Sequence, residues 1–404
     1  MIAKTQSLVC LATSAAFGGA ETSLVTMLTA LRTLEPEWRI TIVTPGRGPL
    51  GDRCRSLGFD VVERPFPAAL ARFGESGAAG GRLMRPIRLL RQGLGAAVSL
   101  PAYLARLRNV LRATRATVVH SNGVKVHVAA ALIKPGGVRL VWHLHEYVRS
   151  RPMSLRIMRS LARRADAIVA NSDSVLADAT AGFGRDAGLS RIYNAVDTQV
   201  FAPDGPRLPL AARSGLPPDD GLVRIGLIAT FARWKGHDVF LDALARLAGR
   251  YALRAYIVGG AVYQTSGSQW SEPELRARAA ERGLSDVVGF TGHVDDVASA
   301  LRSLDIVVHA STEPEPFGMA IAEAMAARRA VVVARGGGAA ELFDDGVNAL
   351  GYPPGDAASL AGRLEELLLN RARREVLASR ARSAAVERFS PERMAQSFRE
   401  VYAR

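Results

Sequence analysis

Short apolar runs alternate with longer stretches in which apolar residues recur every three or four positions, almost throughout the chain. A short apolar run between turn residues is typical of a strand buried on both faces, and the longer pattern is typical of an amphipathic helix. Regular alternation of the two predicts parallel α/β layers. The strands predicted in the first half are Leu8–Ala12, Ile40–Thr44, Asp60–Val62, Thr117–His120, Leu140–His143, Ala167–Asn171 and Arg191–Tyr193.

The pattern lapses once, between Phe201 and Gly221, where prolines and glycines replace it. This composition is typical of a linker. The alternation then restarts, with predicted strands at Arg224–Ala229, Arg254–Val258, Val287–Phe290, Ile306–His309 and Ala330–Val333, and predicted closing helices at Ala357–Leu369, Arg371–Arg388 and Pro391–Arg404.

A chain of 404 residues is too long for one ordinary core and suits two domains. We therefore predict an α/β protein with two Rossmann-like domains that face each other across a cleft. The N-terminal domain would span residues 1–200, the linker 201–221 and the C-terminal domain 222–388, with a helix at 389–404 packing back on the N-terminal domain. Ligands of open parallel sheets bind at the carboxyl ends of the strands, so the chemistry should lie in the cleft.

The start of the chain superficially resembles a signal peptide, because Lys4 precedes an apolar run. The run leads directly into Gly18 and Gly19 and then into a helical apolar pattern, so we interpret it as a strand, a glycine turn and a helix. Cys10 and Cys54 are too few for a disulfide framework and fit two core thiols in a reducing compartment. We expect a cytoplasmic protein.

The net charge of +14 is unevenly distributed. No carboxylate occurs between Ser76 and His145, and the basic segment 82–115 interleaves arginines with leucines. Such a segment suits a surface that meets anionic lipid headgroups, so one hypothesis is peripheral docking on the inner face of the cell membrane. The alternative is an arginine-rich helix face in contact with water.

Two glutamates follow the strand predicted to end at His309. Glu315 lies on the loop that enters the next helix, and Glu323 is predicted about two turns up that helix. Pro316 suits the first helical turn, with Phe317 and Gly318 just inside it. Backbone amides at the helix start can hold a phosphate or sugar oxygen, and a carboxylate further along can accept both ribose hydroxyls.

Here the sequence resembles the retaining glycosyltransferases of family 4, whose mark is a pair of glutamates at this spacing. Further motifs in the same order are Gly18-Gly19-Ala20-Glu21, Asn194-Ala195-Val196-Asp197, Trp234-Lys235-Gly236 and Gly337-Gly338-Ala339-Ala340-Glu341, followed by Asp345, Gly346 and Asn348. The resemblance covers nearly the whole chain and is strongest from Arg224 to Leu369. It implies the two-domain GT-B fold and transfer of a sugar from a nucleotide-diphosphate sugar, which is a co-substrate rather than a cofactor.

The resemblance also implies roles for these residues. Departure of a nucleoside diphosphate leaves negative charge on phosphate, and Lys235 is the natural cation to stabilise it. No Asp-x-Asp triplet is present to hold a metal, so we expect a metal-independent enzyme. Glu315 would bind donor hydroxyls and stabilise positive charge at the sugar carbon, with retention by front-face attack. The predicted donor-binding residues are Gly18, Gly19, Thr230, Arg233, Lys235, Glu315, Phe317, Gly318, Glu323 and Glu341.

Many relatives carry an arginine at the position of Thr230, and here the nearby arginine is Arg233. Which of Thr230, Arg233 and Lys235 contacts the phosphates is left open. The alternative to donor binding is that the two glutamates are ordinary acidic residues near the start of a helix.

Polar residues also follow two strands of the first half. The predicted acceptor-side residues are His120, Asn122, Lys125, His145 and Glu146, and Lys125 and His145 are also candidates for a catalytic role. His127 has apolar neighbours and is as compatible with a core histidine as with a substrate contact. No third ligand lies near the histidines at a metal-site spacing, so we expect no metal.

Three rival functions are compatible with either the fold or the composition. A nucleotide-sugar epimerase or hydrolase can use the same cleft. A nucleic-acid-binding protein would suit the basic charge, but only 6% of the residues are aromatic and no recognition pattern accompanies them. An NAD oxidoreductase is disfavoured because Gly18-Gly19 does not continue into the G-x-G-x-x-G turn. The basic apolar segment favours a lipid-linked or envelope-polysaccharide acceptor.

Overall fold

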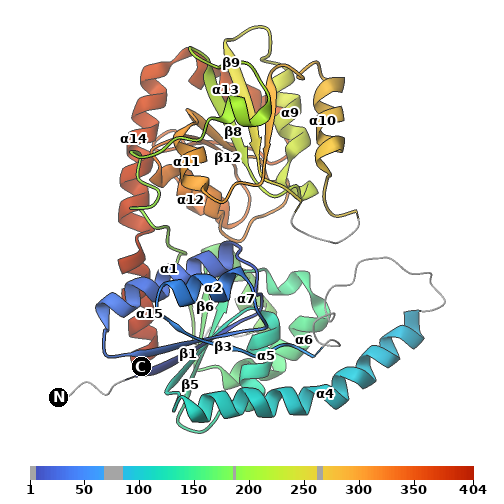
Figure 1. Ribbon diagram of the computed structural model, residues 1–404, viewed down its shortest axis with the longest axis vertical. Helices are drawn as coiled ribbons and strands as arrows, with labels where there is room; N and C mark the ends of the chain where they lie inside the picture. Colours follow the sequence, from blue (N-terminus) through green and yellow to red (C-terminus); the bar gives the residue numbers. More distant parts are fainter. Residues whose placement is uncertain (1–5, 68–84, 185–187, 262–266) are drawn as a thin grey trace. The chain divides into compact units, whose positions relative to one another are not determined.

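The computed structural model describes residues 6–67, 85–184, 188–261 and 267–404, with side chains in the helix after residue 84 described from Ser99 onward. The chain forms two compact units (Figure 1). Unit 1 comprises Met1–Ala195 together with Pro391–Arg404, and unit 2 comprises Val196–Ser390. Each unit is built on one parallel sheet with helices on both faces, which confirms the predicted α/β class.

Unit 1 contains a seven-stranded sheet in the order β3-β2-β1-β4-β5-β6-β7. The strands are β1 (Ser7–Ala12), β2 (Arg39–Thr44), β3 (Asp60–Glu63), β4 (Val118–Asn122), β5 (Arg139–Leu144), β6 (Ala167–Ala170) and β7 (Leu189–Arg191). The helices are α1 (Gly19–Leu34), α2 (Pro49–Ser56), α4 (Arg85–Ala113), α5 (Val124–Ile133), α6 (Pro152–Leu161), α7 (Asp173–Phe183) and α15 (Pro391–Ala403), with short 3₁₀ turns η1 (Val148–Ser150) and η2 (Ala162–Arg164).

Side chains alternate across this sheet, as the pleat of a strand requires. Leu8, Cys10 and Ala12 of β1 pack with α1, α2 and α15 on one face. Val9 and Leu11 pack with α4, α5, α6 and α7 on the other. Both cysteines are buried thiols, as expected, and burial raises the pKa of Cys54 to about 11.

Unit 2 contains a six-stranded sheet in the order β10-β9-β8-β11-β12-β13. The strands are β8 (Val223–Ile228), β9 (Leu253–Val258), β10 (Val288–Gly292), β11 (Ile306–His309), β12 (Ala330–Ala334) and β13 (Leu350–Tyr352). The helices are α8 (Leu210–Ser214), α9 (His237–Ala245), α10 (Glu272–Glu281), α11 (Val297–Arg302), α12 (Met319–Ala326), α13 (Ala357–Leu369) and α14 (Arg371–Arg388), with 3₁₀ turns η3 (Arg233–Lys235) and η4 (Gly338–Glu341). The edge strand β13 was not predicted.

The segment predicted as a linker packs on unit 2. The guanidinium of Arg302 donates to the carbonyls of Val200 and Ala202, and Leu210 of α8 is buried. The units therefore divide at Ala195 rather than within residues 201–221. The prolines and glycines of this segment rule out a long helix but do not prevent a firmly attached, irregular chain.

The last helix, α15, belongs to unit 1 and packs against α1. The hydroxyl of Tyr402 lies 2.7 Å from Nδ1 of His120, and the Nε of Arg139 donates to the carbonyl of Val401 at 2.6 Å. The final helix of the chain thus covers strands from its first half, among them β4 and β5.

Helix α4 holds most of the basic segment 82–115. Residues 82–84, and the side chains of residues 85–98, lie outside the described part of the structure. In the described part, Tyr103, Leu107 and Val110 are buried in the core of unit 1, while Arg106 and Arg112 are exposed. Across the described residues, none of the helices combines the length and the apolar character that crossing a bilayer requires.

Candidate active site

The strongest candidate site lies at the carboxyl end of β11 in unit 2. Glu315 follows β11 on a loop whose backbone forms a parallel bridge with Gly337. Because this bridge keeps the chain extended, α12 begins only at Met319, after Gly318 in a left-handed conformation (φ 101°). Glu323 therefore lies about one turn into α12 rather than the predicted two, and Pro316 precedes the helix.

The carboxylate of Glu315 is surrounded by donors. The Nζ of Lys235 donates to its Oε1 at 2.6 Å, Nε2 of His309 lies 2.6 Å from its Oε2, and the hydroxyl of Ser311 donates to Oε2 at 2.9 Å. Only 13% of the Glu315 side chain and 18% of the Lys235 side chain are exposed. Burial by itself raises the pKa of this carboxyl, but Lys235 and His309 outweigh burial and hold the pKa well below its usual range. Glu315 is therefore ionised at neutral pH.

Backbone hydrogen bonds bring three segments of unit 2 together: the loop that carries Glu315, the Trp234-Lys235-Gly236 motif and the glycine motif that begins at Gly337. The amide of Gly338 donates to the carbonyl of Glu315 at 2.8 Å, and the amide of Thr312 donates to the carbonyl of Trp234 at 2.7 Å. Gly236 has a positive φ of 73°, and a Cβ there would lie 1.8 Å from the carbonyl oxygen of Ala310. Only glycine fits that position, so Trp234-Lys235-Gly236 is held against the end of β11.

Glu323 differs from Glu315 in having no bonded partner. Its side chain is partly exposed, and no described residue forms a hydrogen bond or an ion pair with it. Burial raises its pKa to about 7. A half-buried carboxylate without donors is unfavourable unless a ligand supplies them, so Glu323 is suited to accept hydrogen bonds from hydroxyl groups.

The other predicted donor-site residues of unit 2 are spread around this centre. Thr230 lies partly exposed on the loop after β8. The guanidinium of Arg233 stacks 3.6 Å from the centroid of the Trp270 ring and lies 3.9 Å from Glu274, so it is engaged on the α10 side. Glu341 ends η4, and Phe317 is buried against Phe389.

In unit 1, predicted residues also meet at the carboxyl ends of strands. Nε2 of His145, after β5, lies 2.5 Å from Oδ1 of Asn122 at the end of β4. The side-chain amide of Asn122 donates to the carbonyl of Ala20, in the first turn of α1, at 3.4 Å. Gly18 and Gly19 are exposed at the start of that helix. The glycine loop, Asn122 and His145 thus lie together in one cluster at the carboxyl end of the unit 1 sheet.

Burial keeps His145 neutral, because it lowers the pKa of the imidazole to about 3. Its Nδ1 is buried and has no hydrogen-bond partner among the residues that the structure describes. A neutral imidazole with one unpartnered nitrogen can accept or donate a hydrogen bond to a sugar hydroxyl, depending on its tautomer.

His120 is not part of this cluster. It is fully buried and packs against Phe398 and Tyr402 of α15, so the prediction that it faces an acceptor is wrong. His120 immediately precedes Ser121 on β4. Because successive side chains of a strand point to opposite faces of the sheet, His120 lies on the face that α15 covers. His127 is also fully buried, with Nδ1 2.7 Å from the hydroxyl of Ser121, which supports the core alternative.

Two further acceptor-side candidates lie nearby. Lys125 is in the first turn of α5, with Nζ 5.9 Å from the centroid of the Phe66 ring. Glu146 forms an ion pair with Arg151 at 2.9 Å, and burial raises the pKa of its carboxyl.

Comparison with known protein families agrees with these motifs. The family described as Glycosyltransferase Family 4 matches residues 17–200, and the family described as Glycosyl transferases group 1 matches residues 212–384. The N-terminal half of the chain is therefore similar to family 4 glycosyltransferases, and the C-terminal half is similar to group 1 glycosyl transferases.

Curated relatives of this chain match over part of their length. D-inositol 3-phosphate glycosyltransferase 2 of Catenulispora acidiphila is 38% identical over 213 residues, which cover 50% of this chain and 48% of that protein. The lipopolysaccharide core biosynthesis mannosyltransferase LpcC of Rhizobium leguminosarum is 32% identical over 186 residues, which cover 46% of this chain and 49% of that protein. The chain thus spans about half the length of these relatives.

Among solved structures, Anabaena HepE in complex with UDP has a TM-score of 0.80 and 24% identity, covering 98% of this chain and 100% of that one. Sucrose-phosphate synthase from Thermosynechococcus elongatus has a TM-score of 0.75 and 18% identity, covering 98% of each chain. The chain therefore has the predicted GT-B fold, with two Rossmann-like sheets.

His309 and Ser311 were not predicted as site residues. Both contact Oε2 of Glu315. The available signal was that polar residues at positions 309 and 311 follow a strand of apolar residues and precede the glutamate on the same loop.

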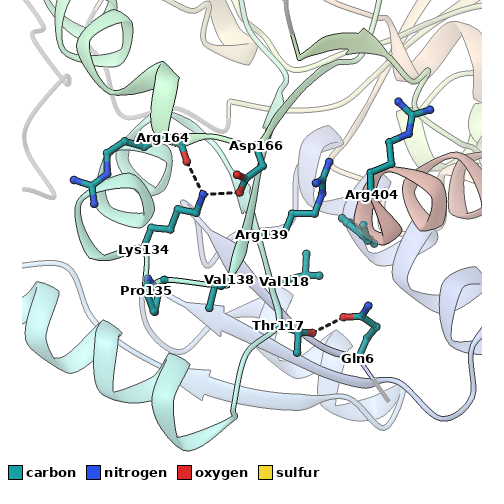
Figure 2. Close-up of a pocket in the computed structure, with 13 residues that line it drawn as sticks. Gln6, Thr117, Val118, Lys134, Pro135, Val138, Arg139, Arg164, Asp166 and Arg404 are labelled. Atoms are coloured by element: carbon teal, nitrogen blue, oxygen red, sulfur yellow. Dashed lines mark hydrogen bonds and ion pairs between the residues drawn. The ribbon is translucent and has the colours of Figure 1, made fainter. Parts of the chain in front are cut away.

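A hollow of about 730 Å³ lies at the end of the unit 1 sheet opposite to the cluster of Asn122 and His145 (Figure 2). Val118 and Arg139, at the first residues of β4 and β5, line it, so it opens at the amino ends of the strands. Inside it Lys134 is already paired with Asp166 at 2.6 Å, while the side chains of Arg164 and Arg404 extend away from it. Since doubly wound sheets bind ligands at the carboxyl ends of their strands, we do not assign a substrate site to this hollow.

Proposed function

We propose that this chain is a retaining glycosyltransferase that moves a sugar from a nucleotide-diphosphate sugar to an acceptor without a metal. The observation that carries the proposal is the pairing of Lys235 with Glu315 on the loop before α12, together with the unpartnered carboxylate of Glu323 about one turn into that helix. The acceptor we propose is a lipid-linked or envelope glycan, and the enzyme would act in the cytoplasm at the membrane surface.

Lys235 would hold the diphosphate. Within the described residues, the bond to Glu315 is the one hydrogen bond of Nζ, which leaves two of its three donors for phosphate oxygens. An ammonium in a largely buried position stabilises the charge that develops on a departing diphosphate more strongly than it would in water.

Glu323 would bind the ribose. Its two carboxylate oxygens match two neighbouring hydroxyl donors, and none of the described residues donates a hydrogen bond to it. A nucleotide that places its ribose at Glu323 and its phosphates at Lys235 would extend along the carboxyl end of β11, where parallel sheets bind nucleotides. The complex of HepE with UDP on the same fold supports a uridine nucleotide as the first ligand to test.

Glu315 would act at the sugar. The bond from the anomeric carbon to the phosphate oxygen breaks, and its electron pair goes to the diphosphate. The acceptor oxygen attacks from the same face and gives its proton to a diphosphate oxygen, so the configuration is retained. The ionised carboxylate of Glu315, fixed by His309, Ser311 and Lys235, is placed to bind donor hydroxyls and to stabilise positive charge at the carbon.

The acceptor would meet the cluster of unit 1. His145, neutral at physiological pH and with an unpartnered Nδ1, is proposed to bind a hydroxyl group, with Lys125 and Glu146 beside it. The relative LpcC is named a lipopolysaccharide core mannosyltransferase, which supports an envelope glycan as the acceptor class.

A thermal-shift screen with UDP, GDP and ADP tests the donor site. One diphosphate at a hundred times its dissociation constant should stabilise the protein by about 2.7 kcal/mol. Lys235→Ala and Glu323→Ala should each reduce this shift, because each removes one end of the binding site. The matched controls are Arg380→Ala and Glu387→Ala, which change exposed charges on α14 of the same unit. An unchanged shift in both site variants would refute the proposed donor site.

A further inference from the structure

Helix α6 carries apolar side chains on its outer face. Met153 and Ile157, one turn apart, are 69% and 41% exposed. On the inner face Met158 is fully buried and Leu155 is partly buried in the core of unit 1. The helix therefore does not need its outer apolar residues to pack on unit 1, and leaving them in water is unfavourable.

The same surface is strongly basic. No carboxylate occurs between Glu146 and Asp166, whereas six arginines in this stretch are exposed: Arg149, Arg151, Arg156, Arg159, Arg163 and Arg164. Arg151 is paired with Glu146, but Arg156 and Arg163 have no ion pair within the residues that the structure describes. Apolar residues flanked by unpaired arginines on a short helix are typical of a segment that lies in a lipid headgroup layer.

The helix is also linked to the acceptor side of unit 1. The strand β5 leads through His145 and Glu146 into η1 and α6, and the ion pair between Glu146 and Arg151 is 2.9 Å long. A surface that binds α6 would therefore lie close to the cluster of Asn122 and His145.

We propose that the outer face of α6 docks on an anionic lipid membrane, with Met153 and Ile157 inserted among the headgroups and the arginines bound to lipid phosphates. The role of this docking, which is to deliver a lipid-linked acceptor to His145, rests on the proposed function. The binding of α6 to a membrane does not depend on it. The membrane is favoured over a nucleic acid because the centre of the face is apolar rather than polar or aromatic. Helix α4 can add charge through Arg106 and Arg112, but its described apolar residues are used in the core.

Vesicle flotation of the full chain tests the proposal. We expect binding to vesicles of phosphatidylcholine with about 30% phosphatidylglycerol at low salt, and little binding to phosphatidylcholine alone. Met153→Ser/Ile157→Ser should weaken binding by at least about tenfold, because two apolar side chains no longer insert. Arg156→Glu should weaken it by roughly 25-fold, since it reverses one charge at the surface.

Matched controls lie on unit 2. Leu369→Ser/Val376→Ser removes two exposed apolar side chains there, and Arg380→Glu reverses one exposed arginine. These variants should bind vesicles like the wild type. Absence of wild-type binding to anionic vesicles, or equal losses in the control variants, would overturn the proposal. Binding that depends on Arg156 but not on Met153 and Ile157 would also overturn it, because it would indicate a polyanion such as a nucleic acid.

Measuring the nucleotide thermal shift of the same variants distinguishes a failure of the membrane inference from a failure of the proposed donor site. Variants of α6 should retain the full shift, because α6 belongs to unit 1, whereas Lys235 and Glu323 belong to unit 2. A normal nucleotide shift without vesicle binding refutes the membrane inference alone. Vesicle binding without any nucleotide shift refutes the proposed donor site alone.

Discussion

Replacing Lys235 by alanine should lower kcat/KM for sugar transfer by roughly 10²–10³-fold. The ammonium of Lys235 lies 2.6 Å from Glu315, and its charge would be needed most when the diphosphate departs. The loss should fall mainly on kcat, because the charge on the leaving group is greater in the transition state than in the bound donor. Initial rates of nucleoside diphosphate release in the presence of acceptor measure the effect.

Arg233→Ala is the matched control for this variant. Its guanidinium is two residues away in sequence, yet it stacks on Trp270 rather than pointing at Glu315. It should therefore change kcat/KM by no more than about threefold, in the range of a surface ion pair. A larger loss in Arg233→Ala than in Lys235→Ala would show that the arginine holds the diphosphate and that Lys235 serves only to pair with Glu315.

Binding of the donor nucleotide should weaken as the pH falls through 7. Burial raises the pKa of Glu323 to about 7 in the free protein, so the carboxylate that accepts ribose hydroxyls is mostly ionised at pH 8 and mostly protonated at pH 6. Hydroxyl donors favour the ionised form, so binding lowers this pKa and the dissociation constant should rise about tenfold from pH 8 to pH 6.

Calorimetric titration of UDP over this range, with Glu323→Gln as the comparison, isolates the effect. The amide cannot ionise, so Glu323→Gln should bind UDP more weakly at pH 8 and should keep only the pH dependence of the nucleotide's own phosphate. If wild type and Glu323→Gln show the same pH profile, Glu323 does not bind the nucleotide.

Much of the fold follows from the local pattern. The predicted strands match those of the structure to within about two residues because strands buried on both faces are nearly continuous apolar runs. Strand β13 was missed because it has only three residues, Leu350–Tyr352, too few for any period to show. The segment 201–221 was misjudged because its attachment to unit 2 depends on Arg302, about 100 residues further along the chain.

The site likewise contains residues that the sequence predicts and residues that it does not. Glu315, Glu323 and Lys235 were recognisable because their chemistry depends on spacing along one strand-loop-helix segment and on a motif. The contact of His309 with Glu315 was missed because it depends on how the loop folds back. His120 was misplaced because Tyr402, its partner, comes from the opposite end of the chain, and a strand pattern does not show which helix covers each face.

The central claim is that Lys235 and Glu323 hold opposite ends of one nucleoside diphosphate. A double-mutant cycle with UDP and its 2′,3′-dideoxy analogue tests it, using dissociation constants for wild type, Lys235→Ala and Glu323→Gln. We expect Lys235→Ala to weaken both ligands equally, and Glu323→Gln to weaken UDP by about tenfold or more while leaving the dideoxy analogue nearly unchanged. Equal losses for the two ligands in Glu323→Gln, or undiminished UDP binding in Lys235→Ala, would contradict the claim.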